Sequence, residues 1–226
     1  MPVFQLTGEL VFPHPVLATD DGLLAIGGDL SQERLLLAYA NGIFPWYSED
    51  SPILWWSPNP RMVLFPDDLK ISRSLKQSLR NQKFTVRFDS NFEAVIRNCA
   101  EIPRKEQDDT WITNEMIEAY IHLHHSGFAH SVETFMNGRL VGGLYGISLG
   151  RIFYGESMFH LERDASKVAL VHLVSRLREW NFLAIDAQQD TAHMRSLGAR
   201  TIPVKDFLGL IEKSLKFPTI KGKWCF

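Results

Sequence analysis

The sequence predicts an α+β fold in which a small N-terminal domain, residues 1–60, precedes a larger domain, residues 61–226, built on a mixed sheet with flanking helices. Three observations support this prediction. Residues 1–60 are rich in prolines and glycine-containing turns, whereas regular patterns begin at about Arg61. In the larger part, a strand hairpin follows several helices, which argues against a doubly wound parallel sheet. The length of 226 residues, 45% of them hydrophobic, suffices for one large domain with a small companion.

The first 60 residues contain one clear helix signal. Ser31 is the predicted N-cap of a helix that ends at Asn41, and Gly42 is the glycine often found just beyond a helix C-terminus. The aromatic run that follows, IFPWYSEDSPILWWSPNPR, contains Pro45, Pro52, Pro58 and Pro60. Because proline lacks a backbone N–H group, we expect neither a long helix nor a central strand in this run. We interpret it as the loop that ends the small domain.

The pattern becomes regular from about Arg61. Alternating or apolar stretches predict strands at residues 62–65, 84–88, 129–136, 139–145, 152–158 and 182–187. Asn137-Gly138 joins the third and fourth of these and is a strong hairpin signal. Amphipathic stretches and caps predict helices at residues 72–81, 90–100, 113–125, 165–180, 191–197 and 204–214. The charged residues 101–109 predict an exposed loop.

The composition is that of an ordinary folded protein. A dedicated nucleic-acid binder is usually more basic than this chain, whose formal net charge is −2, so any RNA contact must come from a local patch. Cys99 and Cys225 lie far apart without a CxxC pair or a histidine cluster, so we expect neither a disulfide framework nor a metal site. We also expect no signal peptide and no membrane span, which requires roughly 20 apolar residues. The predicted location is the reducing cytoplasm.

Three polar residues are candidates for a reaction centre. Glu156 lies in a short apolar strand, where a carboxylate is costly to bury unless it is paired; the alternative is a strand-edge carboxylate that faces water. Asp186 and Gln188 end a predicted strand, and functional groups gather at strand carboxyl ends in open α/β sheets. Because these two residues are two apart, both side chains point to one face of an extended chain and could together orient an attacking amine. The alternative is that one of them caps the next helix.

Two tryptophans lie in loops, where binding pockets are often built. They are Trp46 and Trp111. Either belongs to the core, the usual place of tryptophan, or stacks on a base of a single-stranded RNA end.

Three basic residues recur at spacings of three and four in one predicted helix. They are Arg73, Lys76 and Arg80. This spacing places them on one helix face. Such a stripe is either a solvated face or a patch that contacts phosphates.

Several longer strings occur together in the chain. They are GLLAIGGDL at residues 22–30, GIFPW at 42–46, LWWSP at 54–58, TWIT at 110–113, HS at 130–131, GESMF at 155–159 and SLGA at 196–199. With these strings the chain resembles the leucyl/phenylalanyl-tRNA–protein transferase family from about residue 3 to residue 215. The order of hairpin, strand, long helix, strand and helix resembles the fold of the Gcn5-related N-acetyltransferases, which implies an acetyltransferase-like (GNAT-like) mixed sheet.

The family resemblance implies a specific reaction. Members transfer Leu or Phe, and less readily Met, from an aminoacyl-tRNA to proteins that begin with Arg or Lys, which marks those proteins for degradation by the N-end rule. They use no acetyl-CoA, and we expect no cofactor. The implied partners are aminoacyl-tRNA and an acceptor protein, without a membrane, and we expect a monomer.

The resemblance also implies roles for single residues. The terminal adenosine and neighbouring parts of the aminoacyl end are held by Trp46 and Trp111. The hydrophobic pocket for the transferred side chain is lined by Leu144, Met158 and Ile185. The polar residues of the reaction centre are matched by Glu156, Asp186 and Gln188. Basic residues near the tRNA acceptor stem are matched by Arg73, Lys76 and Arg80.

The implied chemistry is the aminolysis of an activated ester. In our hypothesis Asp186 polarises Gln188, which orients the attacking amine; alternatively, Asp186 binds the cationic acceptor directly. Glu156 then fixes the substrate or the positive side chain of the acceptor. Three alternative functions stay open: an acetyl-CoA-dependent N-acetyltransferase, a non-enzymatic RNA-binding module, and a related transferase with different acceptor residues. The acetyl-CoA signature R/Q-x-x-G-x-G/A is not cleanly matched, because the nearest string ends in Arg200 where a small residue belongs.

Overall fold

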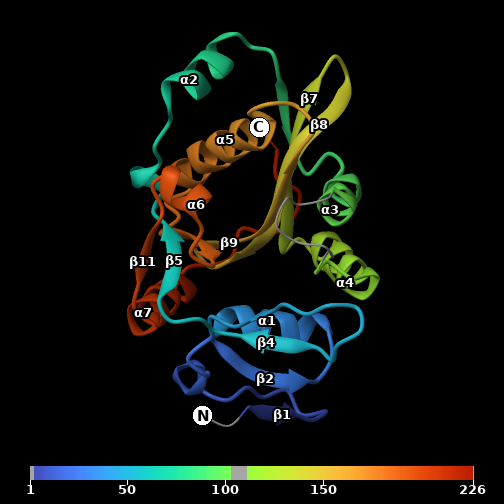
Figure 1. The fold of residues 1–226 in the computed structure, drawn as a ribbon, viewed down its shortest axis with the longest axis vertical. Coiled ribbons are helices and arrows are strands. Elements are labelled where there is room, and N and C mark those ends of the chain that lie inside the picture. Colours follow the sequence, from blue (N-terminus) through green and yellow to red (C-terminus); the bar gives the residue numbers. More distant parts are fainter. Residues whose placement is uncertain (1–2, 103–110, 226) are drawn as a thin grey trace.

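The computed structural model describes residues 3–102 and 111–225. Its smaller sheet has the strand order β1-β2-β4-β3. The strands are β1 (Phe4–Leu6), β2 (Leu23–Gly27), β3 (Phe44–Pro45) and β4 (Leu54–Trp56). β1 pairs parallel with β2, and the other pairings are antiparallel. Helix α1 (Gln32–Ala40) lies on the side of this sheet that faces the rest of the molecule (Figure 1).

The proline-rich run contains a central strand, so the prediction that excluded one is wrong. β4 lies between β2 and β3 in the smaller sheet. It is only three residues long, and Pro52 and Pro58 fall outside it, so its N–H groups stay available for pairing. Trp55 at its centre is fully buried and donates its indole N–H to the carbonyl of Gly27.

The larger sheet has the strand order β11-β5-β10-β9-β8-β7-β6 within the described residues. In chain order the strands are β5 (Arg61–Leu64), β6 (Thr85–Phe88), β7 (Ala129–Met136), β8 (Arg139–Leu149), β9 (Ile152–His160), β10 (Ala184–Gln188) and β11 (Arg200–Ile202). β10 pairs parallel with β9, and the other pairings are antiparallel. The predicted α+β fold, with a small sheet and a larger mixed sheet, is confirmed.

Helices cover both faces of the larger sheet (Figure 1). α3 (Phe92–Glu101) and α4 (Asn114–His125) pack on one face, and α5 (Ala165–Glu179), which connects β9 to β10, packs on the other. The remaining helices are α2 (Arg73–Arg80), α6 (Ala192–Ser196) and α7 (Val204–Leu215), with short 3-10 helices at Pro15–Leu17 and Pro66–Asp68. No helix in the described ranges is both long and apolar enough to cross a membrane.

Most elements of the larger part match their predicted ranges. The predicted hairpin across Asn137-Gly138 is present, although β8 continues to Leu149, beyond the predicted end. The predicted N-cap Ser31 is confirmed, because its hydroxyl accepts the N–H of Arg34. The predicted loop at 101–109 falls almost entirely outside the described residues. Five strands, β1, β2, β3, β4 and β11, have no counterpart among the predicted strands.

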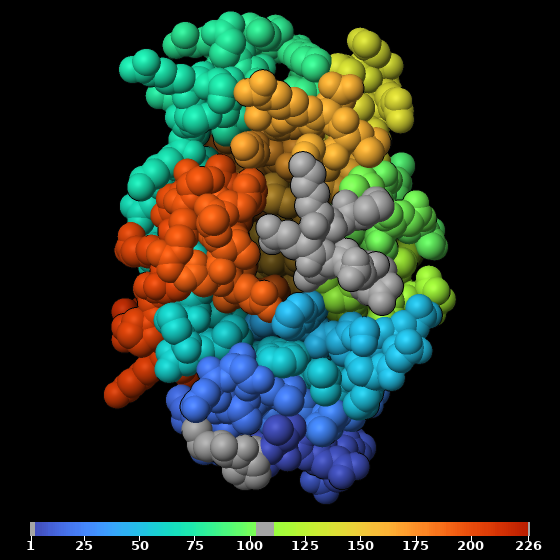
Figure 2. Space-filling view, in the orientation of Figure 1, coloured from blue at the N-terminus to red at the C-terminus, as the bar shows by residue number. Residues whose placement is uncertain are grey.

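The two sheets share one hydrophobic core. Buried residues of the smaller sheet, such as Leu24 and Trp55, belong to the same cluster as Tyr120 and Tyr145 of the larger part. In the space-filling view the N-terminal segment, in blue, packs directly against the segments above it (Figure 2). This packing allows side chains of α1 to reach the larger sheet.

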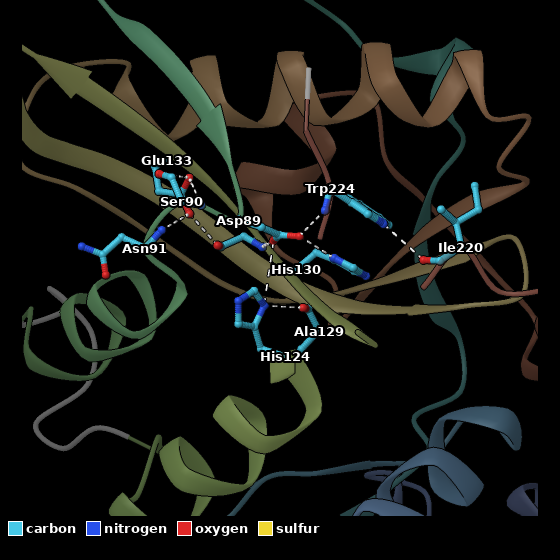
Figure 3. A network of polar contacts seen from close by, with 10 residues as sticks. Asp89, Ser90, Asn91, His124, Ala129, His130, Glu133, Ile220 and Trp224 are labelled. Carbon is cyan, nitrogen blue, oxygen red and sulfur yellow. Dashed lines mark hydrogen bonds and ion pairs between the residues drawn. The ribbon is translucent and has the colours of Figure 1, made fainter. Parts of the chain in front are cut away.

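The C-terminal residues are fastened to the larger sheet by a polar network (Figure 3). The carboxylate of Asp89 accepts the backbone N–H of Trp224 at 2.7 Å and that of Ser131 at 2.8 Å, and it lies 2.9 Å from Nδ1 of His130. The indole of Trp224 stacks on His130, with ring centroids 3.7 Å apart. Burial lowers the pKa of His130, so its ring is neutral in the folded protein near pH 7.

We expect Trp224→Ala to lower the free energy of unfolding by about 3–5 kcal/mol, because it empties a buried aromatic site. Denaturant unfolding followed by circular dichroism measures this change. The neighbouring Cys225 is exposed, so Cys225→Ser is the matched control and should leave the stability unchanged. Equal stability of the two variants would mean that the C-terminal residues do not stabilise the sheet.

Candidate active site

A cavity of about 560 Å³ opens between strands β8, β9 and β10 and helices α5 and α6. Its wall contains the three residues predicted to form an apolar pocket, Leu144, Met158 and Ile185. Glu156 and Asp186 line the same cavity. The fold therefore brings an apolar chamber together with two of the polar residues predicted for the reaction centre.

Glu156 is buried, with 7% of its surface exposed, and three side chains donate to its carboxylate. Oε1 accepts the hydroxyl of Tyr39 and the amide Nε2 of Gln188, both at 2.9 Å, and Oε2 accepts the hydroxyl of Tyr120 at 3.1 Å. Burial raises the pKa of Glu156 to about 7, although the hydrogen bonds from its partners act in the opposite direction. The alternative of a strand-edge carboxylate that faces water is therefore wrong.

Two tyrosines that the sequence analysis did not identify complete this group. Tyr39 comes from α1 and Tyr120 from α4, and their hydroxyls also hydrogen-bond to each other. Burial, followed by the charge of Glu156, raises the pKa of both hydroxyls well above the ordinary value, so both stay neutral. Tyr39 and Glu156 are 117 positions apart in the chain, so no local pattern indicates that they meet.

Asp186 forms a buried ion pair with Arg61, another residue that the sequence analysis did not identify. Nε and Nη2 of Arg61 donate to Oδ1 and Oδ2 of Asp186 at 2.8 and 2.7 Å, and both side chains are fully buried. The guanidinium also lies 4.7 Å from the ring centroid of Phe44 in β3 and 4.9 Å from that of Phe207 in α7. This pair joins β5 to β10, the strand that carries the reaction-centre candidates.

Gln188 leaves the extended conformation that was predicted for it. Its φ is +61°, and the pairing register with β5 shifts between Asp186 and Gln188. Its backbone N–H donates to Oδ1 of Asp186 at 2.9 Å, while its side chain donates to Glu156. The two side chains thus have different partners. The helix-cap alternative is wrong as well, because the N-cap of α6 is Thr191.

The other predicted binding residues lie outside the cavity wall. Trp46 and Trp111 are half-buried against the core that both sheets share, and Trp46 packs edge-to-face on Trp56 at 5.5 Å. Both tryptophans contact the core and also keep part of their surface exposed. Both predicted alternatives, a place in the core and stacking on a base, therefore stay open.

The basic stripe lies on the exposed face of α2, which Figure 1 shows above α5. Arg73, Lys76 and Arg80 are all exposed, whereas Leu75 of the same helix is buried. The predicted division of this helix into a basic face and a core face is therefore present.

Comparison with known proteins identifies the family. The sequence model of the family described as leucyl/phenylalanyl-tRNA protein transferase matches residues 63–212, and that of the family's N-terminal domain matches residues 28–59. The chain belongs to this family. It is 60% identical over 215 residues to the leucyl/phenylalanyl-tRNA–protein transferase of Syntrophobacter fumaroxidans, covering 95% of this chain and 92% of that protein. The protein of the same name from Nitrosospira multiformis is 54% identical over 223 residues, covering 98% and 96%.

Two solved structures are similar to this chain at low scores. A GCN5-related N-acetyltransferase from Kribbella flavida has a TM-score of 0.34 and 10% identity, covering 73% of this chain and 58% of that one. The structure of L-PGS from Bacillus licheniformis has a TM-score of 0.42 and 11% identity, covering 75% and 54%.

Family membership decides between the alternative functions. The chain is an enzyme with leucyl/phenylalanyl-tRNA–protein transferase activity. It is therefore neither an acetyl-CoA-dependent N-acetyltransferase nor a non-enzymatic RNA-binding module. Of the three alternatives, only different acceptor residues stay open.

Replacing Glu156 with Gln removes its titration. Burial raises the pKa of Glu156 in the folded protein from 4.5 to about 7. The protonated side chain therefore adds to the free energy of unfolding; this contribution is fully present below pH 4.5 and is lost as the pH rises through 7. The free energy of unfolding of the wild type, relative to Glu156→Gln, should fall by about 2 kcal/mol between about pH 5 and about pH 8. Urea unfolding of both proteins at the two pH values measures it, and a pH-independent difference would contradict the raised pKa.

Proposed function

We propose that this transferase moves Leu or Phe, and less readily Met, from charged tRNA to the N-terminal Arg or Lys of acceptor proteins, marking them for degradation by the N-end rule. The observation that supports this proposal most is an apolar cavity whose wall contains Glu156. Gln188 and two tyrosines hold that carboxylate by hydrogen bonds. An apolar side chain would enter this cavity with its ester carbonyl at the polar group. We keep the cytoplasm and a monomer as the predicted setting.

The apolar wall supports selection by side-chain shape. Leu144, Met158 and Ile185 contribute aliphatic or thioether surface. A pocket of this kind discriminates by about 1–3 kcal/mol per methylene, so selection among amino acids is graded. Leu and Phe are unbranched at Cβ, and we assign them as the preferred residues over Val and Ile.

Gln188 is the residue best arranged to receive the attacking amine. Its Nε2 is held by Glu156, which fixes the amide plane. No described residue donates to its Oε1, so this oxygen is available to accept an N–H of the amine. Holding the amine and the ester in near-attack geometry contributes up to roughly 7–11 kcal/mol, and the ester itself supplies the driving force.

The contacts of Asp186 favour an indirect role. Both of its oxygens accept from Arg61, and Oδ1 also accepts the backbone N–H of Gln188. Asp186 therefore acts on Gln188 through the main chain, which supports the first of the two hypothesised roles over direct binding of a cationic acceptor. We assign that contact to Glu156, whose carboxylate gains charge as the pH rises through 7.

The remaining assignments place the tRNA around the cavity. Trp46 and Trp111 would hold the terminal adenosine through their partly open rings. The exposed basic face of α2, made of Arg73, Lys76 and Arg80, would contact phosphates of the acceptor stem.

Transfer of labelled amino acids tests this function. With charged tRNA and a peptide that begins with Arg, we expect rapid product formation for Leu and Phe and a rate at least about tenfold lower for Val. A peptide that begins with Ala should give no product. A peptide that begins with Asp tests the alternative acceptors. Equal transfer of Val and Leu would refute the pocket assignment, and transfer only to the Asp peptide would replace the proposed acceptor.

Gln188→Ala should lower kcat by about 10²-fold while the KM for charged tRNA changes little, because the residue orients the amine and does not hold the RNA. The adjacent Gln189 is exposed, so Gln189→Ala is the matched control. Asp186→Ala is a poorer test, because it leaves Arg61 buried without its partner at a cost of about 3–5 kcal/mol in stability. Full turnover by Gln188→Ala would exclude it from the reaction.

A further inference from the structure

A second cavity lies directly beside the first. It has a volume of about 830 Å³ and shares Met158 and His193 with the apolar cavity. Its wall also includes Ser74 of α2, the helix that carries the exposed basic face. The second cavity thus connects the apolar chamber to α2.

Residues with basic side chains outnumber acids on the wall of the second cavity. It contains His160, Arg163, Lys167 and His193, and Asp164 is the one acid among the described residues that line it. Asp164 is already engaged: its carboxylate accepts the hydroxyl of Ser78 at 2.8 Å and lies 3.9 Å from Nε of Arg163.

Lys167 is the cation of this wall that has no described acidic partner. Its side chain is half-buried, and no acid among the described residues lies within ion-pair distance of it. Desolvation, followed by the charges of Lys167 and His160, lowers the pKa of His193, so these three groups act on one another. A partly desolvated cation beside two histidines favours an anionic ligand.

We propose that Lys167, with His160 and His193, binds a backbone phosphate of the single-stranded 3′ end of the tRNA while the amino acid occupies the adjacent cavity. This inference rests on the proposed function. The ester sits on the terminal ribose, and the two nearest phosphodiesters join the terminal adenosine to the preceding nucleotide and that nucleotide to the one before it. A strand that runs from the apolar cavity to α2 passes through the second cavity, where these phosphates meet the basic wall. The competing ligand is an acidic segment of the acceptor protein.

Three aminoacyl donors of decreasing length distinguish a bound tRNA phosphate from a bound acidic segment of the acceptor. The donors are phenylalanyl-tRNA, the phenylalanyl ester of the trinucleotide CCA, and phenylalanyl-adenosine, which has no phosphodiester. Lys167→Gln should lower kcat/KM about tenfold for the first two donors and leave the third unchanged. It should also reduce the slope of log(kcat/KM) against log salt for phenylalanyl-tRNA by about one. Lys167→Arg, which keeps the charge, should restore most of the activity.

The matched control is Lys213→Gln, because Lys213 is an exposed lysine of α7, outside both cavities. An equal loss on all three donors would overturn the inference, since Lys167 would then act on the apolar pocket. A loss confined to phenylalanyl-tRNA, or no loss at all, would overturn it too, as would a rise only in the KM for an acidic acceptor peptide. Wild-type protein that is inactive with every donor would instead contradict the proposed function, so the two failures are distinguishable.

Discussion

The buried pair between Arg61 and Asp186 is the interaction on which the reaction centre depends. It joins two strands of the larger sheet through two hydrogen bonds between side chains that are both fully buried. Burying both charges is costly, and the pair is stable only because geometry and partners are good. The rings of Phe44 and Phe207 close the site on the guanidinium, so the smaller sheet and α7 also contribute to it. Loss of either charge would leave the other buried and uncompensated.

From this pair a chain of contacts leads to the cavity. Asp186 accepts the N–H of Gln188, which supports the positive φ at that residue, and this backbone turn aims the amide at Glu156. Glu156 is then fixed from two further directions by Tyr39 and Tyr120. Because Tyr39 belongs to α1, the helix that lies on the smaller sheet, the N-terminal part of the chain contributes to the proposed reaction centre. The turn at Gln188, with its positive φ, thus lies in the proposed reaction centre, and strained backbone clusters at functional sites.

The sequence predicts those parts of the molecule that are encoded locally. Helix caps such as Ser31, the Asn137-Gly138 hairpin and the basic face of α2 depend on residues a few positions apart, and the structure has all of them. β4 was excluded because prolines flank it, although a three-residue strand fits between them. Arg61, Tyr39 and Tyr120 could not be found in this way, since their partners are distant in the chain. The roles of Trp46 and Trp111 came only from the family strings and stay predictions, as does the domain boundary at residue 60.

The two cavities differ in what they are able to discriminate. The apolar wall responds to the shape of a side chain, and each methylene changes the binding free energy by only a small amount. The basic wall, as proposed, responds to phosphate charge, which is the same in every tRNA and carries no sequence information. On the proposed assignments, the identity of the donor is therefore read mainly at the amino acid and hardly at the tRNA sequence. On these assignments the enzyme needs no base-specific contacts, because any tRNA charged with an amino acid that fits the apolar cavity presents the same phosphates at the same distance from the ester.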